Sequence, residues 1–155
     1  MQRWYRYSTG LVIAVLAGAG CSKAPPPVVD VTGVVLLNGQ PLPKAKVEFI
    51  PQLKGFGADQ NSSDVTDDQG RFTLKYKFGT QPGAVVGLHH VLVTEFNPPE
   101  FHSASAEAQT KLAEYLKTLK NRPIPEDYGN VAKTPLKVEV KPDQKEYKLE
   151  MYRRD

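Results

Sequence analysis

Apolar and polar residues alternate along most of the chain after residue 30, as in β-strands that bury one face. The longest alternation covers residues 71–78 and predicts one continuous strand, with Phe72, Leu74, Tyr76 and Phe78 on its apolar face. Asn38-Gly39 predicts a tight hairpin, because both residues accept a positive φ. The full set of predicted strands is 31–37, 45–49, 64–66, 71–78, 88–96, 136–140 and 147–151.

Residues 97–134 interrupt this pattern and predict a helical insertion. Pro98-Pro99 ends the preceding strand, and Ser103 is the expected N-cap of a helix over about 104–120. Apolar residues then recur at helical spacing, and we expect their stripe to pack on the sheet. The stripe consists of Ala108, Leu112, Tyr115, Leu116 and Leu119. Seven short strands and one inserted amphipathic helix predict an all-β fold, a small antiparallel β-sandwich.

The first 21 residues have the layout of a secretory signal. Arg3 and Arg6 precede the apolar run 11–17, small residues follow, and Cys21 stands at the expected cleavage site. Counted through Gly20, the apolar stretch has ten residues. A membrane-spanning helix needs about twenty, so we expect no transmembrane anchor in this segment.

This order of residues resembles a bacterial lipoprotein signal, whose Cys thiol receives a diacylglyceryl group and becomes the first mature residue. Ala19 and Gly20 fit the lipobox, whereas Gly18 stands where that family prefers Leu. The resemblance implies a signal peptide over residues 1–20, acyl chains such as palmitate on Cys21, and an exported protein of the cell envelope. An ordinary cleaved signal with a stray Cys is the alternative.

Composition narrows the classes of function. The chain has 155 residues, which favours one domain. Without Arg3 and Arg6, residues 21–155 hold 18 basic and 17 acidic side chains, so no strongly basic face for nucleic acid is expected. A single Cys excludes an internal disulfide framework and a Cys-rich zinc site. Residues 21–29 contain three consecutive prolines and predict an extended tether before the domain at 30–155.

Several segments resemble carboxypeptidase regulatory-like, transthyretin-like domains. The similar segments are 31–35, 38–42, 45–49, 66–74, 82–83 and 87–93. Residues 124–140 are similar to a segment of short planctomycete-type lipoproteins. Together the resemblance covers most of residues 30–152. It implies a seven-stranded prealbumin-like (Ig-like) sandwich that serves as an accessory or binding module.

Candidate chemistry is sparse. His89 and His90 are adjacent on a predicted strand and therefore point to opposite faces, so they do not both bind one metal ion. Asp64, Asp67 and Asp68 favour a solvated turn, with an adventitious calcium site as the alternative. Enzymes of similar fold include transthyretin-like hydroxyisourate hydrolases, but their terminal Gly and Ser are absent from the end of this chain, residues 152–155.

We therefore expect a non-catalytic, lipid-anchored binding or structural module without a cofactor. Its expected partners are the membrane, through the anchor, and another envelope protein, a peptide or a glycan, but no nucleic acid. The insertion at about 97–134 is the predicted partner surface, and a lid over the sheet edge is the alternative. The candidate surface residues are Leu112, Tyr115, Leu116 and Tyr128. A small secreted hydrolase or metal enzyme is the competing class.

Overall fold

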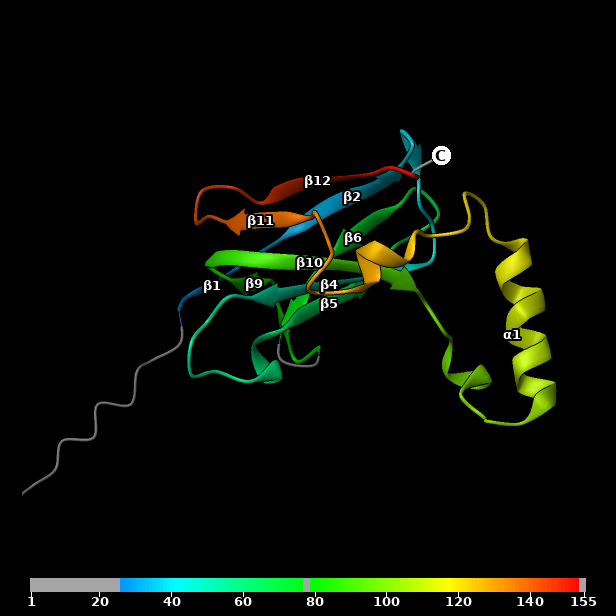
Figure 1. Ribbon diagram of the computed structural model, residues 1–155. Helices are drawn as coiled ribbons and strands as arrows, with labels where there is room; N and C mark the ends of the chain where they lie inside the picture. The colour runs from blue at the N-terminus through cyan, green and yellow to red at the C-terminus, as the bar shows by residue number, and fades with distance from the viewer. Residues whose placement is uncertain (1–25, 77–78, 154–155) are drawn as a thin grey trace, which may run out of the picture.

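The computed structural model describes residues 26–76 and 79–153, which form two facing β-sheets and a projecting helix (Figure 1). The larger sheet has the strand order β11-β10-β4-β5-β7-β8. The smaller sheet has the order β12-β2-β3, with β6 also paired to β2, and β1 pairs with β9 in a separate ribbon. This arrangement confirms a mostly β protein with one inserted helix, of the kind expected for a β-sandwich.

The described residues contain twelve strands, several of only two residues, where the alternation predicts seven. The strands are β1 (Val28–Val29), β2 (Thr32–Leu37), β3 (Gln40–Pro41), β4 (Ala45–Pro51), β5 (Ser62–Val65), β6 (Arg71–Thr73), β7 (Lys75–Tyr76), β8 (Gln81–Pro82), β9 (Ala84–Val85), β10 (Gly87–Glu95), β11 (Lys137–Val140) and β12 (Glu146–Met151). The helices are η1 (Ala58–Gln60), η2 (Pro99–Phe101), α1 (Ala106–Thr118) and η3 (Glu126–Gly129).

The predicted strand over 71–78 changes sheets halfway. β6 pairs with β2 in the smaller sheet, whereas β7 pairs with β5 in the larger one. At the crossing point, the Leu74 N–H donates to Val31 O and the Leu74 carbonyl accepts from the Gly83 N–H. The prediction of one continuous strand is therefore wrong, because new backbone partners take over at Leu74. Residues 77–78, including Phe78, lie outside the described residues.

The sandwich is not wholly antiparallel, which corrects the predicted fold class. β12 runs parallel to β2, with Tyr147 opposite Gly33, Leu149 opposite Val35 and Met151 opposite Leu37. This register places the buried residues of both strands on the inner face of the smaller sheet. Parallel pairing follows because the chain leaves β11 in one sheet and enters β12 in the other, without a hairpin between them.

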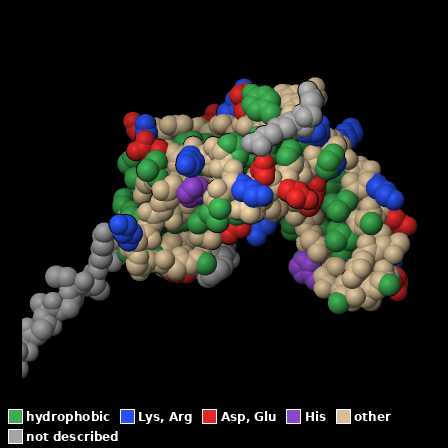
Figure 2. All heavy atoms as spheres, viewed as in Figure 1, with side chains coloured by type: hydrophobic (Ala, Val, Ile, Leu, Met, Phe, Trp, Pro, Cys, Tyr) green, Lys and Arg blue, Asp and Glu red, His purple; other side chains and the backbone are tan. Residues whose placement is uncertain are grey.

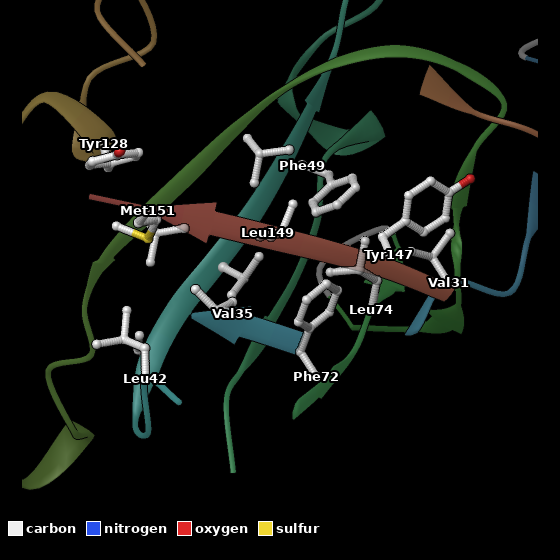
Figure 3. Packing of buried hydrophobic residues seen from close by; sticks show 14 of the residues in the cluster. Val31, Val35, Leu42, Phe49, Phe72, Leu74, Tyr128, Tyr147, Leu149 and Met151 are labelled. Carbon is white, nitrogen blue, oxygen red and sulfur yellow. The ribbon is translucent and has the colours of Figure 1, made fainter. Parts of the chain in front are cut away.

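The core lies between the two sheets (Figure 3). The rings of Phe49 and Phe72 come from opposite sheets, and their centroids are 6.1 Å apart. Leu149 and Met151 on β12 continue this layer, and Tyr128 of η3 closes it beside Met151. Full burial of a large apolar side chain contributes about 1.5–3 kcal/mol, so this layer is the main source of stability.

The helix lies beside the sandwich rather than over a sheet, so the expected packing on the sheet is wrong (Figure 1). We call η2 and α1 together the helical arm, because they contact mainly each other. The rings of Phe101 and Tyr115 are 5.6 Å apart. The N-cap is Ser105, whose Oγ accepts the Ala108 N–H at 3.2 Å, and not Ser103. No helix in the described residues is both long and apolar enough to cross a membrane.

Candidate functional site

The predicted surface residues do not form one surface. Leu112, Tyr115 and Leu116 lie half-buried on the helical arm. Figure 2 shows that hydrophobic side chains are still visible on that projecting lobe. Tyr128 is separate from them and only 7% exposed, so little of its side chain is accessible to a partner. Its ring belongs to the core, and its hydroxyl accepts the Tyr152 N–H at 2.9 Å. Cys21 lies outside the described residues.

A groove of about 340 Å³ lies where η3 meets the chain just after β12. We call it the Tyr152 groove. Because Tyr128 is held in the core, the preceding residues of η3 lie along the groove's rim. Three proline rings and the Tyr152 ring supply its apolar walls. The lining residues are Pro123, Pro125, Glu126, Asp127, Tyr128, Pro135, Tyr152 and Arg153.

The Tyr152 side chain is the most exposed large hydrophobic group of the described residues, at 59%. Its backbone N–H is fixed by the Tyr128 hydroxyl. Its own hydroxyl donates to Glu150 Oε2 at 3.3 Å. The ring is thus held at both ends and presents an aromatic surface to solvent, as aromatic groups in binding sites commonly do.

Arg153 supports the groove wall through contacts to two other segments, residues 121–123 and the turn at Asn38. Its Nε donates to Pro123 O at 3.2 Å, and its Nη2 donates to Asn121 Oδ1 at 3.0 Å. Its backbone N–H donates to Asn38 Oδ1 at 3.0 Å. Through Nε and Nη2 the guanidinium holds the wall of the groove together.

The rim of the groove is acidic. The Glu126 side chain is exposed on η3. The Asp127 carboxylate lies 3.9 Å from Lys133 Nζ, at the limit of an ion pair. Such an exposed pair contributes at most about 1 kcal/mol. A positively charged group that enters the groove would meet the exposed Glu126 carboxylate beside an aromatic ring.

The three histidines are not brought together. His89 is fully buried against Phe49, with ring centroids 5.7 Å apart, whereas His90 lies on the opposite face of β10 and is half-buried. His102 lies in the helical arm segment, with Nε2 at 2.9 Å from Asn97 O. Within residues 26–76 and 79–153, no group of three or more His, Cys, Asp or Glu side chains is arranged to hold a metal ion.

The acidic turn after β5 uses its carboxylates for backbone contacts and a surface ion pair. Asp64 Oδ2 accepts the Thr73 N–H at 2.7 Å, and Asp67 Oδ1 accepts the Arg71 N–H at 2.8 Å. Asp68 forms an exposed ion pair with Lys44 at 3.2 Å. These contacts fit the interpretation of the cluster as a turn.

His89 gives the fold a testable pH dependence. Its Nδ1 lies 2.9 Å from Gly87 O and donates to it, while Nε2 has no partner among the described residues. Burial disfavours the charged ring and lowers the pKa of His89. The unfolded chain therefore binds more protons than the folded one below about pH 6.5, and stability falls as the pH drops through that value.

We expect the free energy of unfolding to decrease by up to about 1.4 kcal/mol per pH unit between pH 6.5 and the lowered folded-state pKa. Urea melts at pH 7.5 and 5.5 measure this loss. In His89→Leu the loss should shrink, whereas in the neighbouring His90→Gln it should match the parent protein. Equal pH slopes in His89→Leu and the parent would show that His89 is not the group responsible.

Sequence reasoning missed most of the Tyr152 groove. The alternation along β12 contains one signal. Continued past the end of the strand, it places Tyr152 on the same outward face as Glu146, Lys148 and Glu150. A single exposed tyrosine is common on protein surfaces, so this signal alone does not identify a binding site. Nothing local indicated that residues 123–135 would lie beside Tyr152, since that contact depends on the tertiary fold.

The fold and the groove together define a mostly β, sandwich-like protein with a projecting helical arm. No protein-family model, curated protein or solved structure matches the chain. The resemblance to transthyretin-like domains and to bacterial lipoproteins therefore remains a prediction from the residues.

Proposed function

We propose that the chain is an exported, lipid-anchored, non-catalytic binding or structural module of the cell envelope. The N-terminal sequence supports the anchor, because the chain's only Cys follows a basic segment, an apolar run and small residues. Two or more acyl chains on Cys21 would hold the protein stably at a membrane, whereas one chain binds only marginally.

The position of residues 26–29, where the described part of the chain begins, is the observation that carries this proposal. Pro27 O accepts the Val86 N–H at 2.8 Å, and β1 pairs with β9 directly before the start of β10. The other end of β10 reaches η3, where Thr94 lies against Gly129. The strand rise separates these ends by roughly 25 Å. β1 lies at the end of the sandwich opposite the helical arm (Figure 1), so an anchor that precedes β1 would favour an orientation with the arm away from the lipid.

The anchor is tested by intact mass of protein extracted from membranes, with Cys21→Ala as the matched variant. We expect a mature chain that begins at Cys21 and carries added acyl mass. In the variant, the added mass should disappear and the protein should leave the membrane fraction. An unmodified chain, or one that keeps residues 1–20, would contradict the lipoprotein proposal.

The binding role is tested separately from the anchor. A photo-crosslinker placed at Tyr152 in cells should capture a discrete envelope partner, which mass spectrometry identifies. A crosslinker at Lys148, on the outward face of the same strand, is the matched control. The same capture at both positions, or at neither, would count against a specific partner surface at this end of the sandwich.

A further inference from the structure

The Tyr152 groove combines apolar walls with a rim that accepts hydrogen bonds but donates few. Pro123, Pro125 and Pro135 lack a backbone N–H. The Tyr152 hydroxyl donates to Glu150, and the Arg153 guanidinium donates to Pro123 and Asn121. The carboxylates of Glu126 and Asp127 can only accept when ionised. A ligand that brings hydrogen-bond donors would therefore find acceptors at this rim.

An arginine side chain has the required chemistry. Its guanidinium carries five N–H donors and no acceptor, and its apolar stem can lie along proline and tyrosine rings. A planar guanidinium also stacks on an aromatic face and can bind a carboxylate through two parallel hydrogen bonds. The volume of about 340 Å³ lies at the lower end of the range for ligand clefts and leaves room for one side chain and its neighbours.

We propose that the Tyr152 groove binds an arginine side chain from an extended segment of a partner protein. The stem packs against Tyr152 and the proline rings, and the guanidinium meets the exposed Glu126 carboxylate. This proposal rests on the proposed function as a binding module and names the chemistry of its partner. A glycan carries no positive charge, so it would not gain the charge-assisted hydrogen bond that Glu126 offers to an arginine.

The test uses the full chain with Cys21→Ala and a fluorescein-labelled peptide, acetyl-Gly-Pro-Arg-Pro-Gly, followed by fluorescence anisotropy. The matched peptide carries citrulline, which has nearly the shape of arginine without its charge. We expect the citrulline peptide to bind at least about tenfold more weakly, since charge-assisted hydrogen bonds are the strong ones. Binding of the arginine peptide should also weaken as salt is raised.

Substitutions in the groove should measure the contributions of the Glu126 carboxylate and of the Tyr152 ring to binding separately. Glu126→Gln is expected to weaken binding of the arginine peptide by about tenfold. Tyr152→Ala should weaken it by about fivefold through loss of the aromatic face. Glu114→Gln removes an exposed carboxylate on the helical arm and should leave binding unchanged. Thermal melts of each variant report whether the protein stays folded.

Equal binding of the two peptides, or an unchanged affinity in Glu126→Gln, would overturn the proposal. Binding of an N-acetylglucosamine tetramer in place of the arginine peptide would also overturn it and would assign the groove to a glycan. Failure of this proposal is distinguishable from failure of the proposed function. Acylation of Cys21 and crosslinking from Tyr152 are measured independently of the peptide.

Discussion

Replacing Gly33 by alanine is expected to lower the free energy of unfolding by about 3 kcal/mol or more. Gly33 lies in β2, the strand that pairs with both β12 and β6. A Cβ atom built there would overlap the backbone oxygen of Tyr147 and come within 2.6 Å of Phe72 Cζ. The backbone oxygen cannot move without separating the parallel strands, so the clash is not relieved by a change of rotamer.

Urea melts of Gly33→Ala and Gly57→Ala form a matched pair. Gly57 has a negative φ, and the nearest atom to its added Cβ is the Asp59 side-chain oxygen at 3.2 Å, which can rotate away. The Gly57 variant should stay within about 0.5 kcal/mol of the parent protein. If Gly33→Ala were equally stable, the close approach of β12 to β2 would be refuted.

Turn chemistry and strand alternation predict the local parts of this fold correctly. Asn38 and Gly39 adopt φ values of 52° and 76°, which the Asn-Gly signal requires. The inward positions of β10, including His89, follow directly from alternation. These features depend on a few neighbouring residues, so the sequence is sufficient to predict them.

Features that depend on distant partners could not be predicted in this way. Alternation over 71–78 identifies an apolar face but not the sheet that faces it, and both sheets bury the same side of this segment. The β12–β2 pairing joins segments more than 100 residues apart, such as Thr32 and Glu146. Its parallel direction is set by where the chain crosses between sheets, which no short pattern encodes.

The candidate surface illustrates the same limit. The spacing of Leu112, Tyr115 and Leu116 predicts a helix correctly, but it does not say that η2 rather than the sheet covers the stripe. Tyr128 lies in an irregular segment, where exposure has no periodic signal. Its burial results from packing beside Met151 and against β10, and its hydroxyl accepts a hydrogen bond from Tyr152 just after the last strand.

Replacing Arg122 by methionine is expected to lower the free energy of unfolding by about 2–3 kcal/mol. The Arg122 side chain is only 11% exposed, and its Nε donates to Glu95 Oε2 at 2.6 Å. Its Nη2 donates to Pro43 O at 2.7 Å. Methionine keeps an apolar stem but leaves the Glu95 carboxylate without its cation and the Pro43 carbonyl without its donor. Because Glu95 is one-third exposed, water compensates part of the loss.

Arg122 follows the helical arm in the chain and binds both the end of β10 and the turn before β4. Its loss should therefore also loosen the arm. We expect limited proteolysis to cut residues 102–121 of Arg122→Met faster than those of the parent protein. Lys111→Met is the control, because its ion pair with Glu107 is exposed on both sides and contributes about 0.5 kcal/mol or less. Equal stability and equal cleavage in the two variants would mean that the arm is held instead by the Asn121 hydrogen bonds to the β2–β3 hairpin and by the Arg153 contacts to Asn121 and Pro123. If only Arg122→Met loses stability and is cleaved faster, the ion pair between Arg122 and Glu95 holds the helical arm to the sandwich. This ion pair lies directly beside the Tyr152 groove.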